Sequence, residues 1–146
     1  MEKKHKIAFG LIIFLGIAFL GLHIYSDLQD DVNREDIVAG TYFVDNSIGS
    51  DENPGNNSNK PWKTLNKVNR YNFPPNSTIL FRKGRTWEGG MEFYSSGKAN
   101  APIKLGAYGV GNRPIIKGQK YGIRLWDANF YVIENLDIRE YSLISF

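Results

Sequence analysis

The chain has 146 residues and a formal net charge of +3, a length that fits one modest domain. It contains no cysteine, which excludes disulfides and thiolate metal sites within it. Its two histidines, His5 and His23, lie near the N-terminus, so the rest of the chain has no histidine for a catalytic triad, a zinc site or a general base.

An apolar segment opens the chain. Lys3, Lys4 and Lys6 precede an uncharged run over residues 7–25, close to the ~20 residues with which a helix crosses a bilayer. We therefore expect residues 1–25 to form a cytoplasmic tail and a retained transmembrane signal-anchor, with all that follows extracytoplasmic. Cleavage of the segment as a secretory signal is the alternative.

Charge is distributed unevenly after this segment. Residues 27–59 hold eight acidic side chains and one basic one, whereas residues 60–124 hold thirteen basic and two acidic ones. Residues 26–40 are accordingly expected to be an acidic linker. Ordinary solvated outer faces of β-structure account for this charge, and the alternative is an anionic partner. Among such partners we expect an anionic polysaccharide and no nucleic acid.

The first ordered elements are expected from residue 41 onward. Residues 41–45 alternate as a strand, residues 46–60 are rich in turn residues, and residues 61–69 carry apolar side chains at helical spacing. A short N-terminal capping helix over residues 61–69 would cover the first coil of a repeating structure.

Four residues in or beside the turn-rich loop have side-chain oxygens that could bind Ca²⁺. Asp45, Asp51, Glu52 and Asn53 offer hard ligands. Their spacing does not match a helical calcium loop, and Asn and Asp are common in turns without metal. Calcium therefore remains one alternative and purely structural turns the other.

Short strands then recur at even spacing. Apolar alternation begins at residues 79, 91, 103 and 115, each a step of 12, and continues at residues 123–125 and 131–139. Such spacing predicts a mainly β domain, either a sandwich or a solenoid whose coil takes two or more steps. The residues expected to face a common core are Ile79, Phe81, Ile103, Leu105, Ile115, Ile123, Leu125, Leu136 and Ile138.

A family resemblance narrows this choice. The motifs that carry it are Tyr42-Phe43-Val44-Asp45, the loop at 49–55, Pro61-Trp62-Lys63-Thr64-Leu65, residues 78–84 with Thr86-Trp87, residues 101–109, residues 113–116 and residues 131–138. Together they resemble the N-terminal portion of right-handed parallel β-helix proteins of the pectate-lyase-like superfamily.

The resemblance implies that residues 41–146 form the first few coils of a truncated right-handed parallel β-helix, a fragment without turnover of its own. It implies a relation to proteins that act on acidic polysaccharides, and for a longer chain it leaves a lyase, a glycoside hydrolase or an epimerase open. A non-catalytic scaffold for surface binding or display is the alternative. The resemblance assigns no catalytic residue and no metal ligand.

Candidate residues follow from the chemistry of such enzymes. A lyase needs a strong base, for which Arg82, Lys83, Arg85 and Lys104 are available. A hydrolase needs two carboxyl groups about 5–9.5 Å apart. The nearby pairs are Glu88 with Glu92 and Asp127 with Glu134. Trp87, Trp126 and Tyr131 could stack on sugar rings, although core packing is the commoner role of strand aromatics.

Overall fold

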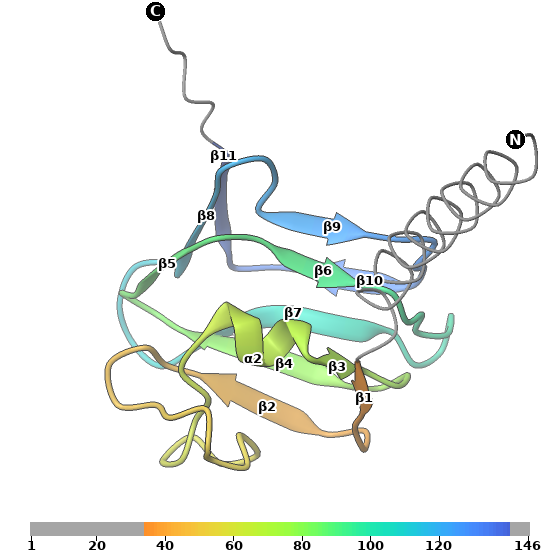
Figure 1. Cartoon of the computed structure of the whole chain (residues 1–146), viewed down its shortest axis with the longest axis horizontal. Helices are drawn as coiled ribbons and strands as arrows, with labels where there is room; N and C mark the ends of the chain where they lie inside the picture. The colour runs from red at the N-terminus through yellow and green to blue at the C-terminus, as the bar shows by residue number, and fades with distance from the viewer. Residues whose placement is uncertain (1–33, 141–146) are drawn as a thin grey trace, which may run out of the picture. The chain divides into compact units, whose positions relative to one another are not determined.

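The computed structural model describes residues 34–140 of the chain. They form short parallel strands and one short helix, which confirms a mainly β domain (Figure 1). The elements are β1 (Glu35–Asp36), β2 (Thr41–Val44), α2 (Leu65–Asn69), β3 (Tyr71–Asn72), β4 (Thr78–Arg82), β5 (Thr86–Glu88), β6 (Met91–Phe93), β7 (Ile103–Tyr108), β8 (Ile115–Gly118), β9 (Ile123–Leu125), β10 (Tyr131–Ile133) and β11 (Asp137–Glu140).

The chain passes through three sheets in turn and then repeats the circuit. One sheet has the order β10-β7-β4-β2, the second β11-β8-β5, and the third β6-β9. Thr78 of β4 pairs with Lys104 of β7 one circuit later, and Ile103 of β7 pairs with Tyr131 of β10 after a further circuit. In Figure 1 the stack runs from β2 at the bottom to the blue strands β8, β9 and β11 at the top.

Alternation along each strand places one set of side chains inside the stack. Ile79 and Phe81 of β4 and Ile103 and Leu105 of β7 have no exposed surface, as predicted. Ile115 is only half-buried and its neighbour Ile116 takes the buried position, so the prediction for this strand was wrong by one residue.

The remaining predicted core residues lie toward the last circuit. Ile123 and Leu136 are partly buried and pack against the core. Leu125 and Ile138 remain 39% and 41% exposed, so the expectation that they are buried was wrong. Their positions at the end of the stack explain the difference, because no described strand covers them.

Helix α2 covers part of the core, as expected, but it is shorter than predicted. Thr64 caps its N-terminus by accepting a hydrogen bond from the Lys67 amide. Leu65 and Val68, three residues apart, bury their side chains beneath it. Trp62, expected inside the helix, instead lies before it and forms a bridge with Val44 of β2.

The N-terminal strand lies within the segment expected as a linker. β1 pairs in parallel with β3, and Glu35 binds Arg70 at 2.5 Å. Among residues 34–140, no helix is long and apolar enough to cross a bilayer. The predicted anchor at residues 7–25 lies outside this range.

Candidate functional site

The outer face of the β6-β9 sheet gathers aromatic and charged side chains. Met91 and Phe93 of β6 point into the core, so Glu92 between them points outward. Glu92 pairs in register with Arg124 of β9. The next outward residue on each strand path is aromatic, namely Tyr94 and Trp126.

Trp126 is the centre of the aromatic part. Its ring is stacked with that of Tyr94, with centroids 6.0 Å apart and an interplanar angle of 17°. The guanidinium carbon of Arg124 lies 3.9 Å from the Trp126 centroid and 5.1 Å from that of Tyr121. Trp126 is nevertheless 40% exposed. The arrangement is a cation–π cluster with accessible aromatic surface.

Glu92 ties the aromatic side chains to the sheet. Its carboxylate accepts hydrogen bonds from the hydroxyls of Tyr94, at 3.0 Å, and Tyr121. The bond to Glu92 is the largest cause of a raised pKa of Tyr121, because a carboxylate favours the protonated phenol. Tyr121 therefore stays a hydrogen-bond donor at neutral pH.

Helix α2 positions this strand. The side-chain amide of Asn69 donates to the carbonyl of Gly90 at 3.0 Å, and its oxygen accepts from the amide of Glu92 at 3.0 Å. The two bonds clamp the start of β6 to the end of the helix. The orientation of Glu92 is thereby fixed by an element that comes much earlier in the chain.

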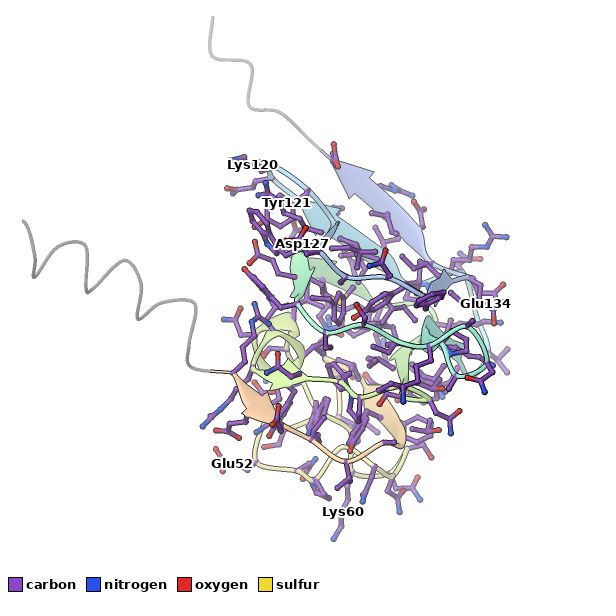
Figure 2. All side chains as sticks on the ribbon, turned by 90° about the vertical axis from the view of Figure 1, so that its right-hand side faces the viewer. Glu52, Lys60, Lys120, Tyr121, Asp127 and Glu134 are labelled. Atoms are coloured by element: carbon purple, nitrogen blue, oxygen red, sulfur yellow. The ribbon has the colours of Figure 1, made fainter. Side chains whose placement is uncertain are left out.

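A surface hollow of about 440 Å³ adjoins the cluster. It is lined by Glu88, Gly89, Gly90, Gln119, Lys120 and Tyr121. A side chain at position 90 would meet the Tyr121 carbonyl at 2.5 Å and its ring at 3.0 Å, so glycine is required there. Tyr121 belongs to both the hollow and the cluster, and we call the two together the β6-β9 surface. Figure 2 labels Tyr121 and Lys120, which lie beside one another.

The fold brings the two residues of one predicted carboxylate pair to the same region of the surface but not those of the other. Glu88 and Glu92 stand on β5 and β6, which belong to different sheets; Glu88 lines the same hollow as Tyr121, whereas Glu92 accepts a hydrogen bond from the Tyr121 hydroxyl. Glu88 also forms an ion pair with Lys117 at 3.4 Å. Asp127 and Glu134 lie on opposite sides of the molecule in Figure 2. The structure therefore does not bring the second pair together.

The predicted basic residues do not form one free cationic surface. Arg85 and Arg82 approach the carboxylate of Asp45 at 3.4 Å and 4.0 Å, and Asp45 is only 3% exposed. Lys104 is exposed on β7, the neighbour of β4, but it pairs with Thr78 at the start of β4, whereas Arg82 pairs with Tyr108 at the other end. Part of the positive charge of residues 60–124 is thus compensated by the acidic segment that precedes it.

The residues considered for Ca²⁺ serve structural contacts. Asp51 accepts hydrogen bonds from the amides of Lys63 and Thr64 and from the Thr64 hydroxyl. Asp45 accepts from the Ser47 amide and contacts the two arginines. Within residues 34–140, no group of three or more potential ligands that could hold a metal ion is found.

The three aromatic residues considered for sugar stacking differ in burial. Trp87 is buried against Phe81 in the core. Tyr131 is largely buried and donates to the Ser95 carbonyl at 2.8 Å, and burial raises its pKa to about 12. Of the three candidates, Trp126 is the most exposed, with 40% of its surface accessible. The sequence reasoning missed Tyr94, Tyr121 and Arg124, although the outward spacing in Glu92-x-Tyr94 and Arg124-x-Trp126 was a usable signal.

Comparisons with known proteins correct the family prediction. No protein family model matches the chain. A lacto-N-biosidase from Bifidobacterium longum subsp. longum is 30% identical over 96 residues, which cover 62% of this chain and 6% of that protein. Two solved structures, native and selenomethionine, of the GH136 lacto-N-biosidase from Eubacterium ramulus match with a TM-score of 0.66 and 25% identity over 73% of this chain.

These findings overturn both the pectate-lyase-like assignment and the relation to acidic-polysaccharide proteins. The relatives found are glycoside hydrolases named for lacto-N-biose. The membrane anchor in the functional prediction gains no support from them, and its residues lie outside the described range. The chain spans 22% of the solved structures and 6% of the curated relative, and within these limits its similarity is to lacto-N-biosidases.

Proposed function

We propose that residues 34–140 are part of a lacto-N-biosidase-like glycoside hydrolase and that the β6-β9 surface binds a neutral oligosaccharide. The observation that carries the proposal is Trp126, which is exposed, contacts the guanidinium of Arg124 and stacks on Tyr94, whose hydroxyl donates to Glu92. An aromatic ring packs against the C–H face of a sugar, while charged groups hydrogen-bond its hydroxyls. Lacto-N-biose has hydroxyl and amide groups and no carboxylate.

In this proposal Glu92 is a binding residue. Its carboxylate is shared by two tyrosine hydroxyls, which orient it toward the outer face of the sheet. Hydrolysis of a glycosidic bond would need two carboxyl groups about 5–9.5 Å apart on either side of the bond. The activity of the longer relatives is therefore proposed for a complete enzyme and not assigned to a residue of this segment.

The architecture belongs to the same proposal. Strands that return to the same sheet on each circuit, always in parallel, are the pattern of a parallel β-helix. Parallel crossovers are right-handed in nearly all proteins, so we propose a right-handed coil. A crystal structure would test this winding, because residue pairings between successive circuits are the same for a coil of either hand.

Binding of lacto-N-biose, measured by calorimetry or by ligand-observed NMR, tests the site. Trp126→Ala should weaken binding about two- to tenfold, which corresponds to ~0.5–1.4 kcal/mol for an aromatic contact. Lys104→Ala, an exposed outward residue on β7, is the matched control and should bind like the unsubstituted chain. Equal affinities for both variants, or preferential binding of oligogalacturonate, would contradict the proposal.

The location of the domain also remains a prediction. We propose that it is extracytoplasmic, supported by the three lysines that precede the apolar run of residues 7–25. Protease treatment of intact cells should degrade the domain, whereas a cytoplasmic marker protein should survive. Protection of both would argue against this location.

A further inference from the structure

Two further hollows continue the β6-β9 surface along one side of the molecule. The hollow that belongs to this surface is lined by Glu88, and we count it as the first. A second hollow, of about 290 Å³, is also lined by Glu88, together with Asn46 and Asn66. A third, of about 400 Å³, is lined by Asn66 and by Glu52 of the turn-rich loop. Neighbouring hollows therefore share a lining residue, and the three form one row.

The row passes over helix α2. Leu65 of this helix is buried in the core, whereas the next residue, Asn66, is exposed on the outer side and lines two of the hollows. Figure 2 labels Lys120 of the first hollow and Glu52 of the third on the same side of the molecule, with α2 drawn between them. We call the second and third hollows together the α2 groove.

Side-chain hydrogen bonds hold the elements of the α2 groove in place. The indole nitrogen of Trp87 donates to the Lys63 carbonyl at 3.0 Å, just before the helix begins. The side-chain amide of Asn46 donates to the Thr86 carbonyl at 2.6 Å, which ties the loop after β2 to β5. Asn69 binds the other end of the helix to β6. A ligand would therefore meet elements that are already fixed relative to one another, which lowers the entropy lost on binding.

The lining of the row suits an uncharged, polar ligand. Every hollow has charged side chains of both signs, namely Glu88 with Lys120 in the first, Glu88 with Lys63 in the second, and Asp51 and Glu52 with Lys67 and Arg70 in the third. Opposite charges offset one another in each hollow, so the row lacks the one-signed potential that attracts a polyanion. The amides of Gln119, Asn46 and Asn66 stand among these charges and can donate hydrogen bonds to sugar hydroxyls or accept them.

We propose that the α2 groove binds the continuation of a neutral oligosaccharide whose first sugar units occupy the β6-β9 surface. This inference rests on the proposed function of that surface. Each hollow has close to the volume of a small-molecule pocket, which is about 300–1,000 Å³, so a disaccharide beside Trp126 leaves the α2 groove empty. Asn66 lines both hollows of the groove and is the residue that contacts the added sugar units.

Calorimetry with neutral sugars of two lengths tests the proposal. Lacto-N-biose is compared with a hexasaccharide of alternating galactose and N-acetylglucosamine. The hexasaccharide should bind at least about tenfold more tightly, because its additional units gain contacts without a second loss of translational freedom. Trp126→Ala should weaken the binding of both sugars, since both occupy the β6-β9 surface.

Asn66→Ala tests the α2 groove separately from the β6-β9 surface. Alanine is the best helix former, so the substitution should leave α2 folded. It should weaken binding of the hexasaccharide about three- to tenfold, as expected for one lost hydrogen bond, and leave binding of lacto-N-biose unchanged. Asn56→Ala is the matched control, because Asn56 is exposed in the loop after β2 and lines none of the three hollows. It should bind both sugars like the unsubstituted chain.

Equal affinities for the two sugars, or an equal effect of Asn66→Ala on both, would overturn the proposal. Equal hexasaccharide affinities of Asn66→Ala and Asn56→Ala would overturn it as well, and so would a hexamer of galacturonate that binds as tightly as the neutral hexasaccharide. The proposed function fails in a different way, namely if lacto-N-biose does not bind. Binding of lacto-N-biose that depends on Trp126 but gains nothing from added length would overturn only the role of the α2 groove.

Discussion

Asp51 links the polar loop after β2 to the start of helix α2. Burial would raise the pKa of its carboxyl group, but the hydrogen bonds from the Thr64 hydroxyl and the Lys63 and Thr64 amides outweigh it and lower the pKa. Thr64 in turn caps the helix that holds Asn69 against β6. A single carboxylate therefore supports the element that orients Glu92.

This pKa makes a prediction for Asp51→Asn. The folded state binds the proton less readily than the unfolded state, so the stabilisation is complete above the unfolded pKa of about 3.8 and is lost as pH falls through the lower folded pKa. At neutral pH the variant should lose about 1 kcal/mol.

Urea unfolding between about pH 7 and pH 2.5 checks the prediction. The stability difference between the unsubstituted chain and Asp51→Asn should shrink below about pH 4. The exposed neighbour Glu52→Gln serves as the control and should change little at neutral pH. A difference that stays constant down to the lowest pH would show that Asp51 acts without its charge.

At the scale of an element, the loop between β2 and α2 is organised around Trp62. Its ring is stacked with Tyr42 at 4.8 Å and with Tyr71 at 5.3 Å, and its indole nitrogen donates to the Asn53 carbonyl at 3.0 Å. Gly55 has a φ of 74°, and a Cβ at this position would overlap the indole. Position 55 therefore requires glycine for two reasons: its left-handed backbone conformation and the lack of space beside the indole.

Gly55→Ala and Gly84→Ala separate these reasons. Gly84 has nearly the same φ, 76°, but a Cβ there would meet nothing within 4 Å. Gly84→Ala should cost only the backbone strain of a left-handed residue, about 1–2 kcal/mol. Gly55→Ala should cost at least about 1 kcal/mol more, as in other overpacked sites. Chemical denaturation with tryptophan fluorescence measures both, and equal losses would mean that Trp62 moves aside freely.

Most strands were predictable because their side chains alternate. The exception at Ile115-Ile116 has a physical cause, since two adjacent apolar residues carry no information on which one faces inward. Pairing of Trp87 with Ile116 decides which of the two is buried, and those partners lie on successive circuits. The strand was thus evident locally while its orientation depended on a neighbour in the preceding circuit.

The candidate site could not be predicted from local sequence either, because it forms only when strands from successive circuits stack. Glu92 and Arg124 are distant in the sequence and meet only because β6 and β9 stack in register. Their individual patterns were visible in the sequence, but the lengths of the intervening turns set the register. The charge excess of residues 60–124 was visible as well, yet its compensation by Asp45 and Glu35 depends on folding.

Stability should also be distributed unevenly over the stack. Leu105 lies in the middle circuit with strands on both sides and is 0% exposed, whereas Ile133 occupies the next position of the same ladder and is 41% exposed. Leu105→Ala removes contacts from a closed core and should cost about 2–5 kcal/mol. Ile133→Ala removes a side chain already in contact with water and should cost less than about 1.5 kcal/mol.

Urea unfolding of the two variants measures these losses, and amide hydrogen exchange gives their distribution. Exchange should be slowest in β4 and β7 and fastest in β10 and β11, because terminal strands open without disrupting the rest. Leu105→Ala should accelerate exchange throughout the stack, whereas Ile133→Ala should act only on the last circuit. Equal losses of stability, or uniform protection from β4 to β11, would show that the last described circuit is as well packed as the central one.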